Sequence, residues 1–283
     1  MAESIKTENT ENTEGSESTE SIKTQSGFKI KFPKSIEEFL IKVTGLTLFA
    51  LKNIKEVFKP PYEFTETLKQ MYEIGYKSLP LVAITGIIIG FTLSLQSIPT
   101  LEKFGAASLV PSMVALAVIL EIGPVITSLI FAGKIGSGIG AELGSMKVTE
   151  QIDAMEVSGT NPFKYLVVTR VTAATFMLPI LVILSDFMSL FGGFIALNLT
   201  TQMSLKLFLM NSFSSIDMKD ILPATFKTFV FGFSIGVVGC YEGYNADRGT
   251  ESVGIAANTA VVIASLLVIL IDMVMVQLTS IIF

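Results

Sequence analysis

Long runs without a charged side chain limit what this chain can fold into. No Asp, Glu, Lys or Arg occurs between Ser78 and Leu101, and the run from Ser108 to Ala132 is interrupted only by Glu121. An α-helix needs about 20 mainly apolar residues to cross the hydrocarbon core of a bilayer. Because backbone polar groups in lipid must be satisfied within the segment itself, such runs are expected to cross as helices. The runs therefore predict an all-α integral membrane protein.

Three further apolar runs follow along the chain. Val171–Leu205 contains one charge, Asp186, and it is followed by Leu222–Tyr241 and by Val253–Gln277, which has Asp272 near its far end. Val171–Leu205 is long for one crossing, so it predicts either a long tilted helix or a span followed by a re-entrant piece. On either interpretation the sequence predicts about five transmembrane helices.

Composition excludes several classes of chemistry. Only 16% of the residues are charged, against about 25% in a typical soluble domain, and half are hydrophobic. The chain has no histidine and a single cysteine, Cys240. These counts argue against histidine-based acid–base catalysis, Cys/His metal sites and an internal disulfide. We expect no metal and no cofactor, and the net charge of −5 gives no reason to expect nucleic acid as a partner.

Two segments precede the first span. Residues 1–27 are rich in Ser, Thr, Asn, Gln and Glu, which predicts a disordered acidic tail that is neither a secretory signal nor a transit peptide. Residues 28–61 carry apolar side chains at helical spacing between lysines and end at Pro60-Pro61. This pattern predicts an amphipathic helix in the cytoplasmic membrane interface, the alternative being a soluble helix packed on a partner. Residues 62–283 would then form the transmembrane domain.

The placement of basic residues predicts the orientation. Residues 28–77 carry nine lysines, and residues 133–170 carry Lys134, Lys147, Lys164 and Arg170. The alternate loops carry fewer, namely Lys103, Lys206 and Lys219. Because basic residues are enriched in cytoplasmic loops, the N-terminus is predicted in the cytoplasm and the C-terminus outside.

One polar stretch, "AELGSMKVTEQIDAMEVSG" (residues 141–159), lies between the second and third spans, on the predicted cytoplasmic side. Thr149 is a candidate N-cap of a short helix, and Gly159 is suited to the position just after its C-terminus. Val148, Ile152 and Met155 would form an apolar stripe, with the acidic residues facing elsewhere. A helix of two or three turns is marginal alone in water, so it is expected to need a partner surface. The alternative is a solvated connector.

Pairs of small residues recur four positions apart in the apolar runs. They are Gly86/Gly90, Gly136/Gly140/Gly144, Gly232/Gly236 and Gly239/Gly243. Such pairs allow membrane helices to approach each other closely. Most are interpreted as packing positions within the chain.

The run "EIGPVITSLIFAGKIGSGIGAELGSMKVTEQIDAMEVSGTNPFKYLVVTR" (residues 121–170) resembles the signature region of the MlaE/YrbE family, permease subunits of ABC transporters that move lipids with Mce-domain proteins. The resemblance continues in "SDFMSLFGG" and "GCYEGYNADRGTESVGIAANTAVV", and it covers roughly residues 35–280. Leu120, Lys134 and Thr169 depart from residues usual in the family, which have arginine, arginine and proline there. The first departure puts in doubt a headgroup contact that needs a cation beside Glu121.

The resemblance implies a set of partners and sites. It makes residues 141–159 a coupling helix for a separate ATP-binding subunit, with Glu142, Lys147, Glu150, Gln151, Asp153 and Glu156 as the coupling residues. No Walker A sequence is present, since Lys134 in "FAGKIGSG" is followed by Ile135, so ATP hydrolysis is assigned to another chain and this one is not an enzyme. A second copy of the permease, an Mce-domain lipid-binding protein and membrane lipids complete the implied partners. The lipid-binding cavity is implied at Gln96, Leu120, Glu121 and Pro124.

Three acidic residues fall in or near apolar spans: Glu121, Asp186 and Asp272. A charge at the centre of a bilayer costs on the order of 2.5–3.5 kcal/mol on insertion scales, so each needs a partner, water or a proton. Gly123-Pro124 beside Glu121 predicts a kinked helix that lines a cavity. With Leu120 as its neighbour, Glu121 is expected to lack a nearby cation and to carry a proton part of the time.

Two other classes of function stay open on the sequence. An ion-coupled secondary transporter would use Glu121 as a proton relay, and a membrane scaffold would hold no lipid inside. The preferred interpretation is a lipid-transport permease in a bacterial inner membrane, the plastid inner envelope being the alternative location.

Overall fold

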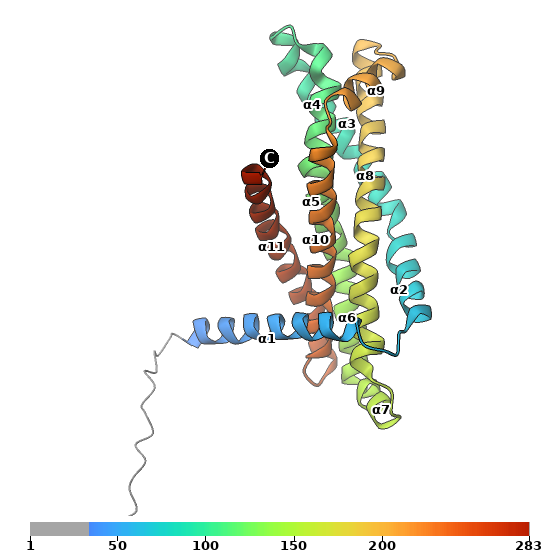
Figure 1. Cartoon of the computed structure of the whole chain (residues 1–283), viewed down its shortest axis with the longest axis vertical. Helices are drawn as coiled ribbons and strands as arrows, with labels where there is room; N and C mark the ends of the chain where they lie inside the picture. The colour runs from blue at the N-terminus through green and yellow to red at the C-terminus, as the bar shows by residue number, and fades with distance from the viewer. Residues whose placement is uncertain (1–33, 283) are drawn as a thin grey trace, which may run out of the picture. The chain divides into compact units, whose positions relative to one another are not determined.

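The computed structural model describes residues 34–282. The tail predicted over residues 1–27 lies outside the described residues, as do residues 28–33 of the predicted amphipathic helix and Phe283. Within the described part, the chain is built from helices and turns and contains no strand, which confirms the all-α prediction. Residues 42–283 form one compact unit (Figure 1).

Five helical segments are long and apolar enough to cross a membrane, as the sequence predicts. They are Phe64–Lys103, Ala107–Val148, Phe163–Thr201, Lys219–Tyr244 and Thr250–Ile281. The first contains α2 (Phe64–Tyr76) and α3 (Leu79–Lys103), the second contains α4 (Val110–Ala117), α5 (Gly123–Phe131) and α6 (Ser137–Val148), and the others correspond to α8 (Thr169–Thr201), α10 (Met218–Tyr244) and α11 (Thr250–Ile282).

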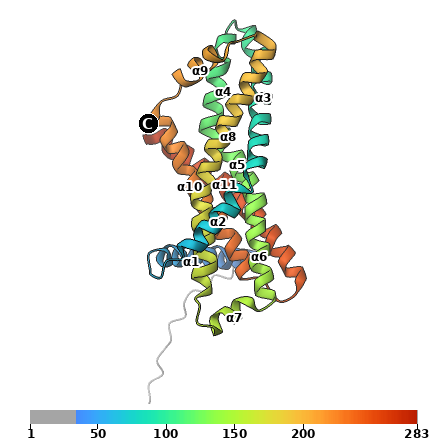
Figure 2. The same cartoon turned by 90° about the vertical axis from the view of Figure 1, so that its right-hand side faces the viewer.

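The third span is one long helix, which decides between the two interpretations of residues 171–205. A π-helical turn over Phe163–Val168 leads into α8, and Pro179 does not interrupt that helix. Gln202 ends it in a left-handed conformation with φ of 53°. A separate short helix, α9 (Leu205–Ser214), follows and is capped by Ser204. Figure 2 shows α9 and α7 (Gln151–Val157) at opposite ends of the bundle.

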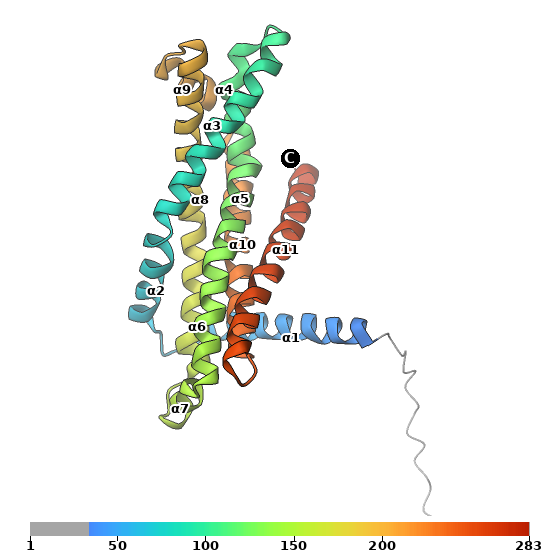
Figure 3. The same ribbon diagram turned by 180° about the vertical axis from the view of Figure 1, so that it is seen from behind.

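Close helix contacts are made through the predicted glycine pairs. A Cβ at Gly90 would overlap the Ser189 backbone carbonyl on α8, and one at Gly243 would lie within contact distance of the Gly140 carbonyl on α6. Gly232 and Gly236 face Ala174 and Val171 in the same way. These contacts confirm the packing interpretation for α3, α6, α8 and α10, and Figure 3 shows α6 beside α11.

The helix predicted before the first span is α1 (Lys34–Val57). Leu46, Phe49, Ala50 and Val57 on one side pack against the main hydrophobic core of the bundle. Val43, Leu48, Leu51 and Ile54 are exposed apolar side chains on the remaining surface. Exposed apolar residues on an amphipathic helix are compatible with the membrane interface, and the interfacial location remains a prediction.

Candidate functional site

Lys227 on α10 lies at the centre of a charge cluster inside the spans. Its Nζ donates to Glu121 Oε2 at 2.8 Å and to Asp272 Oδ1 at 2.9 Å, and its side chain is only 5% exposed. The cluster joins the second, fourth and fifth spans. The expectation that Glu121 has no cation nearby is therefore wrong.

The cation was missed because it is distant in sequence. Lys227 is 106 residues from Glu121, so the search for a cation at the neighbouring position 120 could not find it. The signal was nevertheless present, because Lys227 lies within the predicted span Leu222–Tyr241 and carries the same insertion cost as the three acidic residues. A buried lysine next to two carboxylates provides the charge compensation that each group needs in a low-dielectric environment.

A cavity of about 350 Å³ opens beside this cluster. Its polar wall contains Glu121, Asp220, Lys227, Thr279 and Ser280, and its apolar wall contains Leu120, Pro223, Ala224 and Val276. Glu121 is 46% exposed at the side chain, whereas Lys227 is almost covered. The cavity therefore presents a carboxylate to an incoming ligand and keeps the ammonium group behind it. Its volume lies at the lower end of the roughly 300–1,000 Å³ typical of ligand pockets.

A second, more apolar cavity of about 210 Å³ contains Asp186. Asp186 Oδ1 is buried without a hydrogen-bond partner in the described part of the chain, and a Cβ at Gly123 would collide with it. Glycine at position 123 thus makes room for the carboxylate. Ala224 lines both cavities, so the two are neighbours across α10.

The residues implied for lipid binding divide between these cavities. Leu120 and Glu121 line the first, and Pro124 lines the second. Gln96 is exposed on α3 and lines neither. Glu121 lies in a π-helical turn over Val118–Ile122, directly before α5, which has a proline in its first turn. This irregularity agrees with the predicted kink, and π-helical turns of this kind are frequent at functional sites.

The polar stretch of residues 141–159 is divided between two helices. Its first part belongs to α6, which continues the second span to Val148, and only Gln151–Val157 forms the separate helix α7. The glycines in α6 do not end that helix, because Gly140 and Gly144 pack closely against α11. The candidate coupling helix is therefore shorter than predicted.

The predicted N-cap of this helix is also wrong. Thr149 ends α6 and its hydroxyl donates to the Ser145 carbonyl at 2.8 Å, a local bond that serves the preceding helix. Glu150 precedes α7 in a left-handed conformation with φ of 58° and reverses the chain direction. The C-terminal prediction is confirmed, because Gly159 has φ of 81° just after the helix.

The apolar stripe of α7 packs within the chain itself. Ile152 is 1% exposed and Met155 packs against the same hydrophobic core. The expectation that this stripe fills a groove on a partner therefore needs correction: its burial against the bundle already stabilises the short helix. The outward surface instead presents Gln151, Asp153, Glu156 and Val157, which is 91% exposed.

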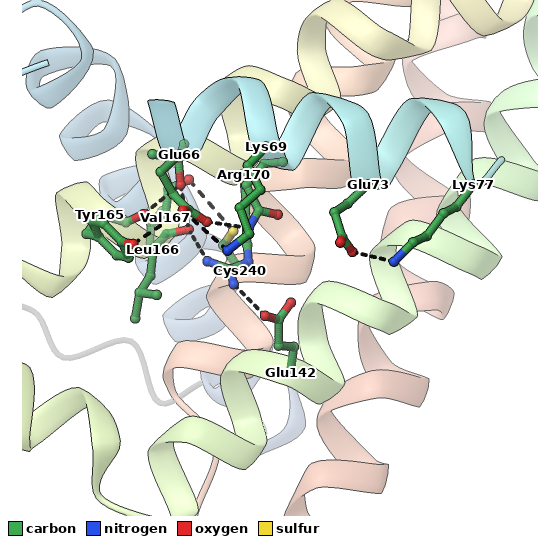
Figure 4. A network of polar contacts seen from close by, with 12 residues as sticks. Glu66, Lys69, Glu73, Lys77, Glu142, Tyr165, Leu166, Val167, Arg170 and Cys240 are labelled. Atoms are coloured by element: carbon green, nitrogen blue, oxygen red, sulfur yellow. Dashed lines mark hydrogen bonds and ion pairs between the residues drawn. The ribbon is translucent and has the colours of Figure 1, made fainter. Parts of the chain in front are cut away.

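Three of the six candidate coupling residues, Glu142, Lys147 and Asp153, form ion pairs within the chain. Glu142 Oε1 accepts from Arg170 Nη2 at 2.7 Å, and Arg170 also donates to the Leu166 carbonyl (Figure 4). Lys147 Nζ donates to Asp153 Oδ1 at 2.9 Å, which joins α6 to α7. Glu150, Gln151 and Glu156 are exposed.

A polar network connects the C-terminal end of α6 to the beginning of the first and third spans. The buried Arg170 side chain lies near Glu142 and Cys240 (Figure 4). In the same region, the Tyr165 hydroxyl donates to Glu66 Oε2 on α2 at 3.2 Å. Displacement of α6 would therefore act on α8 through one charge-assisted hydrogen bond.

Five candidate spans with a charged cavity between them define a multi-pass membrane protein. The chain matches the family described as permease MlaE over residues 67–278, and it belongs to that family. It is 36% identical over 241 residues to a probable ABC transporter permease protein of Rickettsia typhi, covering 85% of this chain and 90% of that one. A probable ABC transporter permease protein of Synechocystis is 36% identical over 206 residues, covering 73% and 78%.

A third relative comes from a plant. The chloroplastic protein trigalactosyldiacylglycerol 1 of Arabidopsis thaliana is 28% identical over 241 residues, covering 85% of this chain and 69% of that one. The comparisons together identify the chain as an ABC transporter permease, a multi-pass membrane protein that works with an ATPase subunit. This identification confirms the resemblance drawn from residues 121–170.

Proposed function

We propose that this permease moves lipid, with a phospholipid headgroup received in the cavity beside Lys227. The observation that carries the proposal is the cluster of Glu121, Lys227 and Asp272, of which Glu121 and Lys227 line a cavity within the spans. A charged cluster surrounded by apolar spans suits an amphiphile, whose headgroup meets the charges while its chains remain in an apolar environment. The plant relative named for a galactolipid supports a lipid cargo.

The charge distribution favours a headgroup with a cationic part. Glu121 is half exposed to the cavity and Asp220 also lines it, whereas the Lys227 ammonium already lies between two carboxylates. An incoming ammonium group would therefore meet carboxylate oxygens first. A phosphate could then accept from Lys227 only if one carboxylate moved away, so binding and rearrangement of the cluster would be linked.

The proposed assembly contains two copies of this chain, two ATPase subunits and an Mce-domain protein on the outer side of a bacterial inner membrane. Bacterial relatives support that membrane, and the chloroplastic relative keeps the plastid inner envelope as the alternative. Membership of an ABC permease family favours transport driven by ATP over an ion-coupled transporter or a scaffold. In the proposed orientation, α7 and the cytoplasmic end of α6 face the ATPase, and Gln96, Leu120, Glu121 and Pro124 belong to the lipid pathway.

Transport in proteoliposomes together with crosslinking tests the proposal. A photoreactive amino acid at position 121 should form adducts with phospholipid, and ATP-dependent lipid movement should fall far more in Glu121→Lys than in Glu121→Gln. The glutamine keeps the shape and a hydrogen bond to Lys227, whereas the lysine replaces a carboxylate bonded to Lys227 with a second cation. Absence of lipid adducts at position 121, with full transport by the lysine variant, would overturn the proposal.

A further inference from the structure

We propose a second lipid site, separate from the Lys227 cavity, where the carboxamide of Asn53 binds the ester region of a glycerophospholipid. Asn53 is on the side of α1 that packs against the bundle, and it is 1% exposed. Neither its amide nitrogen nor its amide oxygen has a hydrogen-bond partner among the residues that the structure describes. A buried carboxamide without partners is unfavourable, so an apolar residue would serve mere packing better at this position.

Asn53 is a polar residue on an otherwise apolar stripe of α1. Phe49, Ala50 and Val57, at helical spacing from Asn53, are apolar and pack against the core. Asn53 therefore interrupts the apolar stripe where the stripe is deepest. Both a donor and an acceptor remain unsatisfied among residues 34–282, and we assign the missing partner to a bound molecule that can use at least one of them.

Asn53 lines a cavity of about 210 Å³ between α1, α8 and α10. The other lining residues are predominantly apolar: Ile54, Val57, Phe58, Val171, Thr172, Thr175, Phe176 and Phe233. Ile54, Phe58 and Phe176 are exposed, so the mouth of the cavity is apolar as well. A cavity with an apolar mouth on a membrane-spanning helix opens toward acyl chains, and its single unsatisfied amide selects an amphiphile over a pure hydrocarbon.

The dimensions and surroundings define which part of a lipid fits. The volume is below the roughly 300–1,000 Å³ of a complete ligand pocket, so the cavity holds only a section of a lipid. An ester carbonyl can accept from the Asn53 amide nitrogen while the first methylenes of the chain contact Val57 and Phe233. Lys164 and Glu63 line an adjoining cavity beyond Val57 and Thr172, and the buried Lys164 ammonium donates to the Lys59 carbonyl, so the polar part of the lipid would lie on this side.

This site does not depend on the cargo proposed for the Lys227 cavity. It requires only that α1 and α8 contact the bilayer, and it would anchor α1 to the third span through a bound lipid. It would therefore be occupied in the absence of ATP and of transport, a condition that separates its test from the transport experiment above.

Photolabelling in nanodiscs tests the assignment. The full chain is reconstituted in phosphatidylethanolamine and phosphatidylglycerol with a trace of phosphatidylglycerol that carries a diazirine in its acyl chain, and adducts are mapped by mass spectrometry. Labelling should concentrate on residues 53–58 and 171–176. Asn53→Leu keeps the side-chain size but removes the hydrogen bond, and it should lower this labelling about fivefold. Ile54→Trp, which fills the mouth, should lower it comparably.

Matched controls make the outcome decisive. Leu51→Trp places the same bulk on an exposed position of the same helix outside the cavity, and it should label like the parent. A diether form of the probe lacks the ester carbonyl, so it should label the parent several-fold less than the ester probe does. The ester and diether probes should label Asn53→Leu to the same extent. The leucine variant should unfold at the same temperature as the parent or higher, which shows that reduced labelling does not come from misfolding.

Three results would overturn the proposal. In the first, the cavity is labelled no more strongly than the exposed face of α11. In the second, Asn53→Leu is labelled as strongly as the parent. In the third, the ester and diether probes label the parent equally.

Discussion

At the scale of single residues, charge inside the spans is organised by pairing. Lys227 is 5% exposed and bonded to two carboxylates, while Asp186 Oδ1 is buried without a partner in the described chain. A buried ion pair contributes little net stability relative to apolar packing, but the loss of one member leaves an uncompensated charge. Substitution of one member of the Lys227 cluster is thus expected to lower the stability of the protein more than simultaneous replacement of all three charged residues.

Lys227→Met should destabilise the permease by on the order of 3 kcal/mol, because Glu121 and Asp272 lose their common partner. The triple variant with Glu121→Gln and Asp272→Asn should recover most of that loss, because no unpaired charge remains. Thermal unfolding of the detergent-solubilised protein measures both. A triple variant as unstable as Lys227→Met would show that the lysine acts through packing.

At the scale of elements, close contacts between helices determine which elements can move independently. α3 and α8 approach so closely at Gly90 that a Cβ would overlap the Ser189 carbonyl. α7, by contrast, is a short helix held by Ile152, by Met155 and by the Lys147–Asp153 ion pair. The first pair of helices is expected to move together, while α7 has an exposed acidic surface.

Gly90→Ala should destabilise the protein by about 1–3 kcal/mol, because the added methyl group forces α3 away from the α8 backbone. Gly138→Ala is the matched control, since a Cβ there meets nothing within 4 Å. It should stay within about 1 kcal/mol of the parent, on the stabilising side, because alanine favours helix. Unfolding temperatures and yields from membranes compare the two variants, and equal losses would contradict the packing account.

Reversal of the exposed charges at Glu150, just before α7, and Glu156, on α7, should weaken the proposed contact with the ATPase. Glu150→Lys with Glu156→Lys should leave folding unchanged, because both residues are exposed. Copurification of the ATPase subunit should drop about tenfold, corresponding to about 1.4 kcal/mol of binding free energy. Glu102→Lys, at an exposed site on the other end of the bundle, is the control and should copurify normally. If the double variant copurified as much ATPase subunit as the parent, this acidic surface would not contribute to ATPase binding.

At the scale of the whole molecule, α7 and α9 lie at opposite ends of the bundle (Figure 2), so five crossings would place them on opposite sides of a membrane. Each of these helices packs against a different hydrophobic cluster. The cluster with Ile152 of α7 also includes Phe163, and the cluster with Phe208 of α9 also includes Ile98. The positive-inside distribution assigns the side with α7 to the cytoplasm, and this orientation remains a prediction.

Cysteine labelling in intact cells tests the orientation. With Cys240 replaced by alanine, Lys103→Cys should react with an impermeant thiol reagent added outside, and Ser158→Cys should react only after the membrane is opened. Both positions are exposed, so burial does not explain a difference between them. Labelling of Ser158→Cys from outside would reverse the assigned orientation.

Features that depend on neighbouring residues could be predicted from the sequence. Uncharged runs predicted the spans because the cost of crossing a bilayer is a sum over consecutive residues, and Gly159 ended α7 where a left-handed residue was expected. The family resemblance at residues 121–170 also follows from sequence alone and was confirmed. The N-cap of α7 was predicted one residue too early, because the Thr149 hydroxyl donates to the Ser145 carbonyl and serves α6 instead.

The sequence by itself therefore determined the class of protein, the number of spans and the family. Only the tertiary structure decided which groups meet: Lys227 with Glu121 and Asp272, Arg170 with Glu142, and the stripe of α7 with the core of its own chain. Hydropathy is local, whereas these partners lie 106, 45 and 28 residues apart and depend on how each helix is rotated against its neighbours. That rotation is determined by the packing of all the spans together, which no single segment of sequence contains.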